Sequence, residues 1–381
     1  MTEIHGNIDP AFAHLHAAFA DGFSSGREVG AHLVIIVDGQ VVVDLHAGYT
    51  DRKKEKPWRS DTLCCFFSVS KALTTTVLLG AVADGEVDLD APVARYWPEF
   101  AQADKSEITV RQLMSHQAGL PAFDEPVERE IYYDWDRTCA QLAMTTPWWT
   151  PGTDHGYHAR SFGFLLGEVV CRVKGMRFRD VFDAWVAPPQ IELCFGLDDV
   201  QMTRCADMLP AKIDPARRNS MPEGSQNMLR DLRDPQTLTG AVFQNPNLGP
   251  GYMNKPAFRQ AVMPAVNGHG SARGVAEFFA QIPQWLPESL LQEAATTHSQ
   301  GHDKVLQSPT RFGLGYMLHD EQAPVGWSGC LGHAGAGGSL GFVDPHRNVA
   351  FAYVMNQMEE GVVTGGTSAN KCADALFDHI K

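Results

Sequence analysis

Apolar residues gather in strand-like runs near both ends of the chain, and helical patterns occupy the middle. Residues 32–37 and 40–45 are rich in valine, isoleucine and leucine, and Asp38-Gly39 lies between them. Two β-rich runs around Asp-Gly predict a hairpin. The other predicted terminal elements are a second hairpin of 338–343 and 349–355, a helix over 9–23 with Asp9 as its N-cap, and a helix over 367–380.

The middle of the chain reads as helices between loops rich in proline and glycine. The predicted helices span residues 68–85, 109–116, 135–144, 161–174 and 272–282. Because strand pairs flank this region, the pattern favours an α+β fold in which both termini build one antiparallel sheet flanked by helices. A mainly helical subdomain is inserted between them. We therefore expect one domain over 1–381, with an α/β subdomain at 1–60 and 270–381 and a helical one at 61–269.

One stretch, residues 210–264, is polar and rich in proline, glycine and asparagine. It predicts a long irregular segment. A segment of that length inside a compact domain is usually functional or poorly ordered.

The amino-acid composition limits the classes of binding partner that the chain is suited to. Of 381 residues, 44% are hydrophobic and 20% are charged, and the net charge is -14. The longest basic run is Arg52-Lys53-Lys54, so nucleic acid and anionic membrane are poor partners. The first residues lack a basic segment followed by an apolar one, and no run approaches the ~20 apolar residues that span a bilayer. We expect a cytoplasmic protein.

Cysteine and histidine do not form recognisable metal or disulfide patterns. The eight cysteines include no C-x-x-C, and the adjacent pair Cys64-Cys65 is interpreted as buried free thiols, with a reactive thiol as the alternative. His155 and His158 have a suggestive spacing, but no H-E-x-x-H or Cys/His cluster accompanies them. We therefore expect neither a metal nor a cofactor.

The segment Ser68-Val69-Ser70-Lys71 carries the strongest chemical signal. It stands where an apolar run gives way to a helical run. A serine and a lysine three residues apart share one helix face, so an amine can reach a hydroxyl at the helix start. This pair can activate the alcohol as a nucleophile. The alternative is a serine that only caps the helix.

Two other serines compete for this role. Ser368 and Lys371 repeat the spacing, but a polar, glycine- and threonine-rich lead-in makes Ser368 a helix cap. Ser339 lies within Gly337-Gly338-Ser339-Leu340-Gly341 and so fits the G-x-S-x-G nucleophile elbow. That elbow requires a following helix, whereas a predicted strand follows Ser339.

Two further segments offer a proton relay and an oxyanion-binding group, which a serine–lysine pair does not itself provide. Tyr157 lies between a turn and a predicted helix, where it can relay a proton, because a lysine charge favours the phenolate; it can equally be a packing tyrosine. The glycine-rich segment 332–338 enters a predicted strand. Exposed main-chain N–H groups there can bind an oxyanion, and a simple glycine-rich turn is the alternative.

Together these segments resemble the β-lactamase-related serine hydrolases, which include penicillin-binding proteins and class C β-lactamases. Ser68-Val69-Ser70-Lys71 matches their first motif, Tyr157-His158-Ala159 falls at their Tyr-x-Asn motif, and His333-Ala334-Gly335 falls at their Lys-Thr-Gly motif on an edge strand. The resemblance covers most of the chain. It implies a β-lactamase/DD-peptidase-like fold, catalysis by Ser68, Lys71 and Tyr157, and an oxyanion hole from the N–H groups of Ser68 and Ala336.

Two departures indicate the carboxylesterase branch of that family, family VIII. Ala159 replaces an amide suited to acylamino substrates, and His333 replaces a lysine suited to a substrate carboxylate. The resemblance therefore implies hydrolysis of short-chain esters, a small-molecule substrate. The alternatives are a β-lactamase, an amide hydrolase or an acyltransferase with the same acyl-enzyme, and an inactive penicillin-binding-like protein.

Residues expected to line the substrate site are His333, Gly335, Tyr133 and Trp149, with Tyr132, Trp135 and Trp148 as further aromatic candidates. Whether Lys71 or Tyr157 is the primary base is open, and so is assembly into a homo-oligomer.

Overall fold

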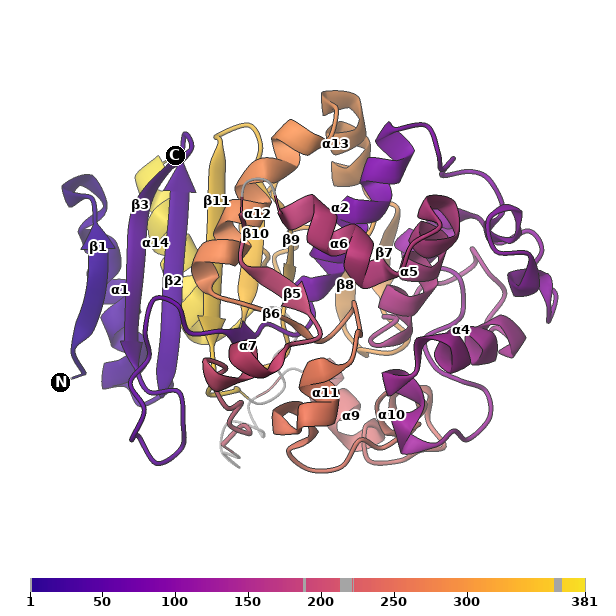
Figure 1. Cartoon of the computed structure of the whole chain (residues 1–381), viewed down its shortest axis with the longest axis horizontal. Coiled ribbons are helices and arrows are strands. Elements are labelled where there is room, and N and C mark those ends of the chain that lie inside the picture. Colours follow the sequence, from indigo (N-terminus) through magenta and orange to yellow (C-terminus); the bar gives the residue numbers. More distant parts are fainter. Residues whose placement is uncertain (1, 188–189, 213–220, 222, 360–364, 381) are drawn as a thin grey trace.

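The computed structural model describes residues 2–187, 190–212, 221, 223–359 and 365–380, and its centre is a six-stranded antiparallel sheet built from both ends of the chain. Figure 1 shows the N-terminal strands at one side of the sheet and the C-terminal strands beside them. The α+β expectation is thereby confirmed. The strands in spatial order are β1 (Ile4–Ile8), β3 (Gln40–Gly48), β2 (Gly30–Val37), β11 (Val349–Met355), β10 (Leu340–Asp344) and β9 (Leu331–Ala334).

The two predicted hairpins form for the reasons expected. At the first turn Asp38 and Gly39 both have positive φ, 51° and 75°, as a two-residue turn between twisted strands requires. At the second turn the Asp344 carboxylate accepts the main-chain N–H groups of His346 (2.9 Å) and Arg347 (3.1 Å). β1 was not predicted, because its polar, largely exposed residues lack strand-like alternation.

Helices cover both faces of the sheet (Figure 1). α1 (His14–Ser24) and α14 (Thr367–Ile380) pack together against one face, and α12 (Ala272–Trp285) packs on the other, over β2, β11 and β10. The helix expected over 9–23 is broken. Asp9 does cap, accepting the Ala11 N–H at 2.8 Å, but it caps a short 3-10 turn, Pro10–Phe12, that precedes α1.

The remaining helices lie mostly beyond β9. α2 (Val69–Ala83) packs between β9 and α5 (Ser161–Lys174), and nearly all of its residues are buried. The other helices are α3 (Val110–Met114), α4 (Trp135–Met144), α6 (Phe178–Val186), α7 (Asp199–Thr203) and α13 (Glu288–Ala295), with 3-10 turns at Val93–Arg95, Pro98–Ala101, Arg129–Tyr133 and Tyr252–Asn254. Short strands are β4 (Cys64–Cys65), β5 (Leu193–Phe195), β6 (Gly268–Gly270), β7 (Ser299–His302) and β8 (Pro309–Phe312).

The stretch 210–264 is less irregular than predicted. Residues 213–220 and 222 of it lie outside the described residues. The rest contains α9 (Glu223–Asp231), α10 (Leu238–Gln244) and α11 (Pro256–Gln260). These helices have five to nine residues, too few for hydrophobic periodicity to reveal them. The subdomain division at residues 60 and 270 stays a prediction.

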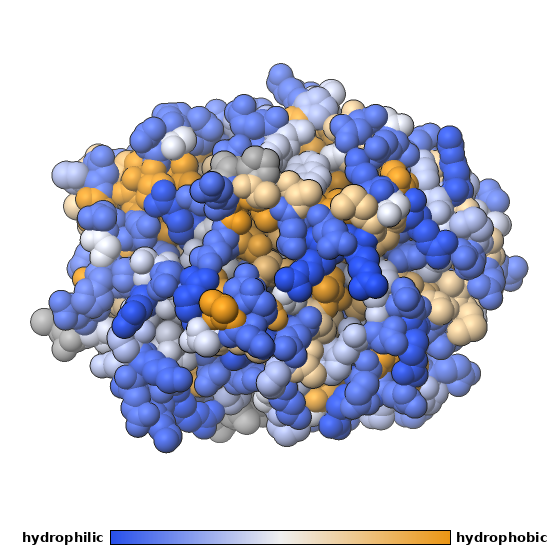
Figure 2. Space-filling view, viewed as in Figure 1, coloured by the Kyte–Doolittle hydropathy of each residue, from blue (hydrophilic) through white to orange (hydrophobic). Residues whose placement is uncertain are grey.

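The surface is mainly hydrophilic, with hydrophobic areas over the β1–β3–β2 end of the sheet (Figure 2). Within the described part of the chain, no helix combines the length and the apolar character needed to cross a bilayer.

Candidate active site

Ser68 stands at a strained junction between a buried strand and a buried helix. β4 ends at Cys65, and Phe67 then adopts φ = 46°, in the left-handed region that non-glycine residues avoid. Ser68 is the N-cap residue of α2, yet its hydroxyl makes no capping hydrogen bond. Ser70 stabilises the turn by donating its hydroxyl to the Phe67 carbonyl and accepting the Gly268 N–H at 2.9 Å. The Ser68 hydroxyl is therefore available for chemistry rather than capping.

Lys71 follows one helical turn later and is fully buried. Its Nζ lies 3.3 Å from Ser68 Oγ, 2.8 Å from the Ala159 carbonyl oxygen and 3.1 Å from the Ala265 carbonyl oxygen. Burial lowers the pKa of Lys71 well below its usual 10.5, and no ion-pair partner is found for it among the described residues. The arrangement therefore favours a neutral amine.

A neutral amine has two N–H groups and one lone pair. In that form, the carbonyls of Ala159 and Ala265 would take up both N–H groups and leave the lone pair for the Ser68 hydroxyl, whereas a protonated amine donates to all three oxygens. Sequence reasoning found the serine and the lysine but missed both carbonyls. A main-chain carbonyl has no side-chain identity, so no sequence signal could have revealed them.

Tyr157 is the third group brought to this place. Its side chain is buried, and Lys71 Nζ lies 4.5 Å from the centroid of its ring. Burial raises the pKa of the Tyr157 phenol, and a hydrogen bond with Ser68 opposes that rise only in part. We expected the lysine charge to favour a phenolate. Burial acts against that expectation, because it lowers the pKa of Lys71 and raises the pKa of Tyr157 and so disfavours the charged form of both groups.

A small hairpin, β7–β8, holds Tyr157 in position. Asp303, in its loop, accepts the Tyr157 main-chain N–H at 3.0 Å, and Phe312 of β8 stacks on the Tyr157 ring with centroids 6.1 Å apart. His116 adds a ring contact at 5.2 Å. Asp303 and Phe312 were missed because neither belongs to a sequence motif.

His333, on the edge strand β9, is fully buried, with its ring centroid 5.9 Å from that of Tyr157. Its Nδ1 donates to the Ala334 carbonyl at 2.6 Å, and its Nε2 has no partner among the described residues. Burial, helped by the nearby Lys71, lowers the pKa of His333 to about 3. The imidazole is therefore neutral near pH 7 and cannot replace a cationic lysine.

Gly335 brings the end of β9 against the nucleophile segment. A Cβ atom at this position would lie only 2.3 Å from the Phe66 carbonyl oxygen, so only glycine permits the approach. Within the described part of the chain, the main-chain N–H groups of Ser68 and Ala336 donate no hydrogen bond. Two unused N–H groups on neighbouring segments can bind an oxyanion.

The aromatic residues expected to line the substrate site lie in different parts of the structure. Tyr132 stacks on Phe164 in the core, and the Trp135 indole donates to Glu168 at 2.7 Å. Trp149 packs near His158, with ring centroids 6.0 Å apart. Trp148 is partly exposed, and Tyr133 lines a cavity beside α4, α5 and α6. No contact among the described residues joins Tyr133 or Trp149 to Ser68, so their substrate roles stay predictions.

The competing serines occupy other environments. Ser339 is buried and runs directly into strand β10, without the helix that an elbow requires. Ser368 lies in α14 and accepts a hydrogen bond from Arg27 at 3.4 Å, and Lys371 pairs with Asp21 at 2.6 Å. The second serine–lysine pair is therefore divided between two contacts, since Ser368 is buried beside Arg27 and Lys371 forms an exposed ion pair.

The thiols and the His155–His158 spacing have structural explanations. Cys64 and Cys65 are buried free thiols, and burial raises the pKa of Cys65 to about 12, which argues against a reactive thiolate. His158 donates Nδ1–H to the Gly156 carbonyl at 2.7 Å and accepts the Leu120 N–H on Nε2 at 3.0 Å. Both ring nitrogens are thus engaged, leaving none for a metal.

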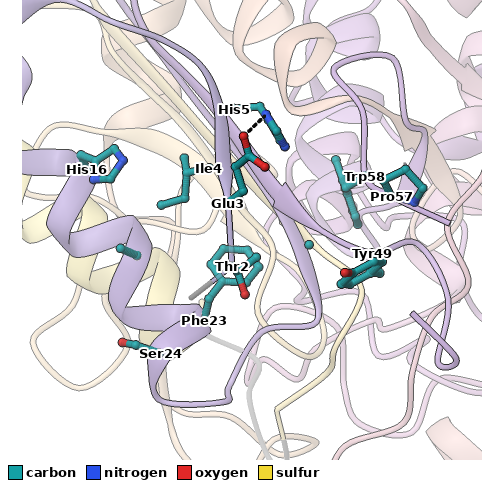
Figure 3. Close-up of a pocket in the computed structure, with 12 residues that line it drawn as sticks. Thr2, Glu3, Ile4, His5, His16, Phe23, Ser24, Tyr49, Pro57 and Trp58 are labelled. Carbon is teal, nitrogen blue, oxygen red and sulfur yellow. Dashed lines mark ion pairs between the residues drawn. The ribbon is translucent and has the colours of Figure 1, made fainter. Parts of the chain in front are cut away.

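A cavity of about 1090 Å³ lies away from Ser68, at the β1 edge of the sheet (Figure 3). Its lining includes His5, His16, Tyr49 and Trp58 but no serine–lysine pair. Ser68 is the stronger candidate, because a hydroxyl, an amine and two unused main-chain N–H groups lie together there.

Comparisons with known proteins agree with this geometry. The family model described as Beta-lactamase matches residues 11–371. The chain is 30% identical to the esterase/beta-lactamase LipL of Mycobacterium tuberculosis, covering 93% of this chain and 83% of LipL. It is 28% identical to the esterase EstB of Burkholderia gladioli, covering 92% and 91%. The crystal structure of a family VIII carboxylesterase superposes with a TM-score of 0.87 at 33% identity, over 99% and 100% of the two chains.

Proposed function

This chain belongs to the beta-lactamase family, and from that membership we propose that it is a serine carboxylesterase acting on short-chain carboxylic esters. The observation that carries the proposal is the 3.3 Å contact between Ser68 Oγ and Lys71 Nζ. The two other hydrogen-bond partners of this amine are the main-chain carbonyls of Ala159 and Ala265. That environment keeps the amine ready to accept a proton.

In the first half of the proposed reaction, Ser68 Oγ attacks the ester carbonyl carbon while its proton moves to the Lys71 lone pair. The neutral Tyr157 phenol then donates its proton to the departing alkoxide as the carbon–oxygen bond breaks. The resulting ammonium and phenolate are close, because Nζ lies 4.5 Å from the ring centroid. Proton transfer from Lys71 to Tyr157 restores both neutral groups, so Lys71 is the primary base and Tyr157 the general acid.

The tetrahedral intermediate carries its negative charge on the former carbonyl oxygen. We assign its stabilisation to the free N–H groups of Ser68 and Ala336. Losing one such donor typically costs about 10²–10³ in turnover. Water then attacks the acyl-enzyme, giving one proton to Lys71, and Tyr157 returns a proton to Ser68 Oγ as the acid leaves.

Two residues favour an ester over a β-lactam. Burial keeps His333 neutral, so the position offers no cation to a β-lactam carboxylate. Ala159 has no side-chain amide to bind an acylamino group; its main-chain carbonyl binds Lys71 instead. A β-lactamase remains the second candidate, because the relative LipL is described as an esterase/beta-lactamase.

A serine-reactive phosphonate tests the nucleophile. The intact protein should gain the mass of one phosphonyl group on the peptide containing Ser68. Ser68→Ala should gain none, whereas the matched control Ser339→Ala should label like the wild type. Labelling of another peptide refutes the assignment, and a protein that gains no mass supports the inactive-protein reading.

A substrate panel tests the class. Acetate and butyrate p-nitrophenyl esters should turn over faster than long-chain esters, a chromogenic cephalosporin and an anilide. A cephalosporin preference would identify a β-lactamase instead. Transfer of the acyl group to an added alcohol in preference to water would identify an acyltransferase.

A further inference from the structure

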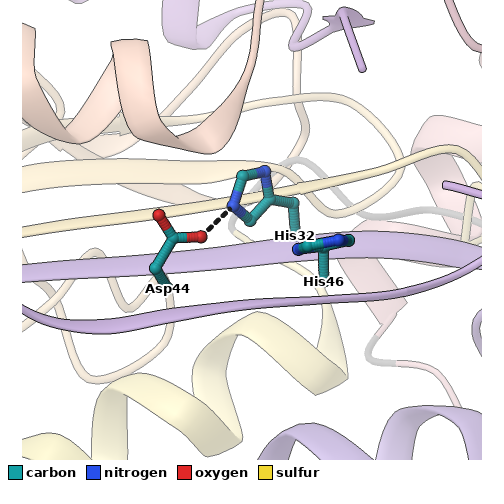
Figure 4. Close-up of side chains that lie close together, drawn as sticks. All are labelled: His32, Asp44 and His46. Carbon is teal, nitrogen blue, oxygen red and sulfur yellow. Dashed lines mark hydrogen bonds and ion pairs between the residues drawn. The ribbon is translucent and has the colours of Figure 1, made fainter. Parts of the chain in front are cut away.

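A second cluster of reactive side chains lies on the sheet, on β2 and β3, outside the Ser68 site. His32 and His46 are directly opposite each other in the β2–β3 register, and Asp44 lies two residues before His46 on the same strand. Because side chains two apart on a strand share a face, all three project from one side of the sheet. Figure 4 shows them together, with Asp44 pointing at the His32 ring.

We propose that His32, Asp44 and His46 form a binding site for a divalent first-row transition metal of the zinc type, separate from the catalytic site. One ligand atom from each of the three lies within 4.8 Å of the other two. Zinc–nitrogen and zinc–oxygen bonds are about 2.0–2.2 Å long, so small side-chain rotations bring three such atoms onto one ion. Two imidazoles and a carboxylate suit zinc and its neighbours better than magnesium or calcium.

The polar atoms of the cluster are not fully used. His32 is completely buried, and the Nδ1 atom of His46 is buried without a hydrogen-bond partner among the described residues. Leaving such atoms unpaired is costly unless something else binds them. The Asp44 carboxylate contacts His32 Nε2 at 2.8 Å, where a metal ion would take the place of the shared proton.

The surroundings of the cluster are mixed in charge. Arg273 of α12 contacts the second Asp44 oxygen at 3.3 Å, and Glu277 pairs with Arg273 in turn. Asp61 acts on His46 from the loop after β3. Two guanidinium groups, Arg273 and Arg204 (3.8 Å from Asp61), oppose a cation, and the three carboxylates of Asp44, Asp61 and Glu277 favour it. Arg273 can also orient Asp44 as a second-layer partner.

The neighbouring strand offers a fourth ligand. His5 of β1 is opposite His46 in the β1–β3 register, with ring centroids 5.8 Å apart, and its side chain is half exposed. His5 also lines the cavity of about 1090 Å³ at the sheet edge (Figure 3). A metal there would link β1, β3 and β2, so the expected role is stabilisation of the N-terminal end of the sheet.

The test titrates the full-length protein, freed of metal by a chelator, with Zn²⁺ alone by calorimetry and with Co²⁺ by visible absorption. The wild type should bind one equivalent, and Zn²⁺ should raise its unfolding temperature. His46→Asn and Asp44→Asn should each weaken binding by at least about tenfold and abolish the rise. His14→Asn is the matched control, since His14 packs against His379 as a histidine pair on the α1–α14 side of the sheet.

Three results overturn the proposal: no binding by the wild type, unchanged binding by His46→Asn and Asp44→Asn, or an equal loss in His14→Asn. A cooperative unfolding transition of each metal-free variant shows that the variant is folded. Where a variant does not fold, the wild-type titration still tests whether the protein binds Zn²⁺. Because Ser68 is not a ligand, esterase activity can fail or persist independently of these readouts.

Discussion

Replacing Lys71 by methionine tests whether the amine beside Ser68 is uncharged in the folded protein. Methionine keeps an unbranched side chain but has no base, so kcat/KM should fall by about 10²–10⁴, the usual contribution of a general base. That loss corresponds to roughly 3–5 kcal/mol of transition-state stabilisation. The wild-type activity should also fall at acid pH, where protonation of Lys71 removes the lone pair that accepts the Ser68 proton.

The same substitution has a signature in stability. Burial makes the folded pKa of Lys71 lower than its usual 10.5, so between those two values the unfolded chain binds one proton more than the folded chain. The wild-type free energy of unfolding therefore gains a contribution that grows as pH rises through this window. For one proton the slope is about 1.4 kcal/mol per pH unit as long as the pH lies between the folded and the unfolded pKa of Lys71.

The slope is more informative than the stability at one pH. Lys71→Met leaves the carbonyls of Ala159 and Ala265 without their donor, at about 1–3 kcal/mol each. It also removes the cost of burying an amine that is charged when unfolded. The lost hydrogen bonds lower the free energy of unfolding and the removal of the buried amine raises it. Only the second effect depends on pH.

Urea unfolding at pH 7, 8 and 9 measures the difference. The wild-type curve should rise relative to Lys71→Met with the slope given above. Lys371→Met, in the second serine–lysine pair, is the matched control and should follow the wild type in both stability slope and activity. Parallel stability curves for wild type and Lys71→Met would mean that the folded amine is charged, and the proposed base would then be wrong.

Two further substitutions test the acid and the strand approach. Tyr157→Phe should lower kcat/KM for an alkyl ester by about 10²–10⁴ while affecting a p-nitrophenyl ester much less, because nitrophenolate leaves without a proton; equal losses on the two substrates would remove Tyr157 from the general-acid role. Gly335→Ala places a Cβ 2.3 Å from the Phe66 carbonyl oxygen, so activity should fall and the free energy of unfolding should drop by about 1–3 kcal/mol in urea titrations. Wild-type activity and wild-type stability in Gly335→Ala would show that the segments around Gly335 and Phe66 can move apart without cost.

Local chemistry explains which parts of the fold were predictable. Asp38-Gly39 specifies its hairpin because both residues tolerate the positive φ that the turn requires. α4, α5 and α14 have ten or more residues, and their bounds agree with the predicted ones. β1 escaped because an edge strand with exposed polar residues gives no alternation. α9, α10 and α11 escaped because they are short and depend on tertiary contacts for their stability.

The residues of the candidate site likewise separate into those that the local sequence predicts and those that depend on tertiary contacts. Ser68 and Lys71 were predictable because three residues along a helix fix their separation. Tyr157 and the glycine-rich segment around Gly335 were candidates from their local sequence, but only the family resemblance tied them to Ser68. The Ala265 carbonyl and Asp303 could not be predicted: one belongs to the main chain, and the other reaches Tyr157 only after β7 and β8 have folded.

The neutrality of His333 changes what must keep Lys71 deprotonated. A second cation at that position would repel a charge on Lys71, but the buried imidazole supplies none, so burial alone lowers the lysine pKa. Lys71 is fully buried by protein atoms, whereas Ser68 remains slightly exposed at 9%. A substrate therefore need not bring a long acyl chain to cover the base. That independence is a physical reason for a short-chain ester to be a competent substrate.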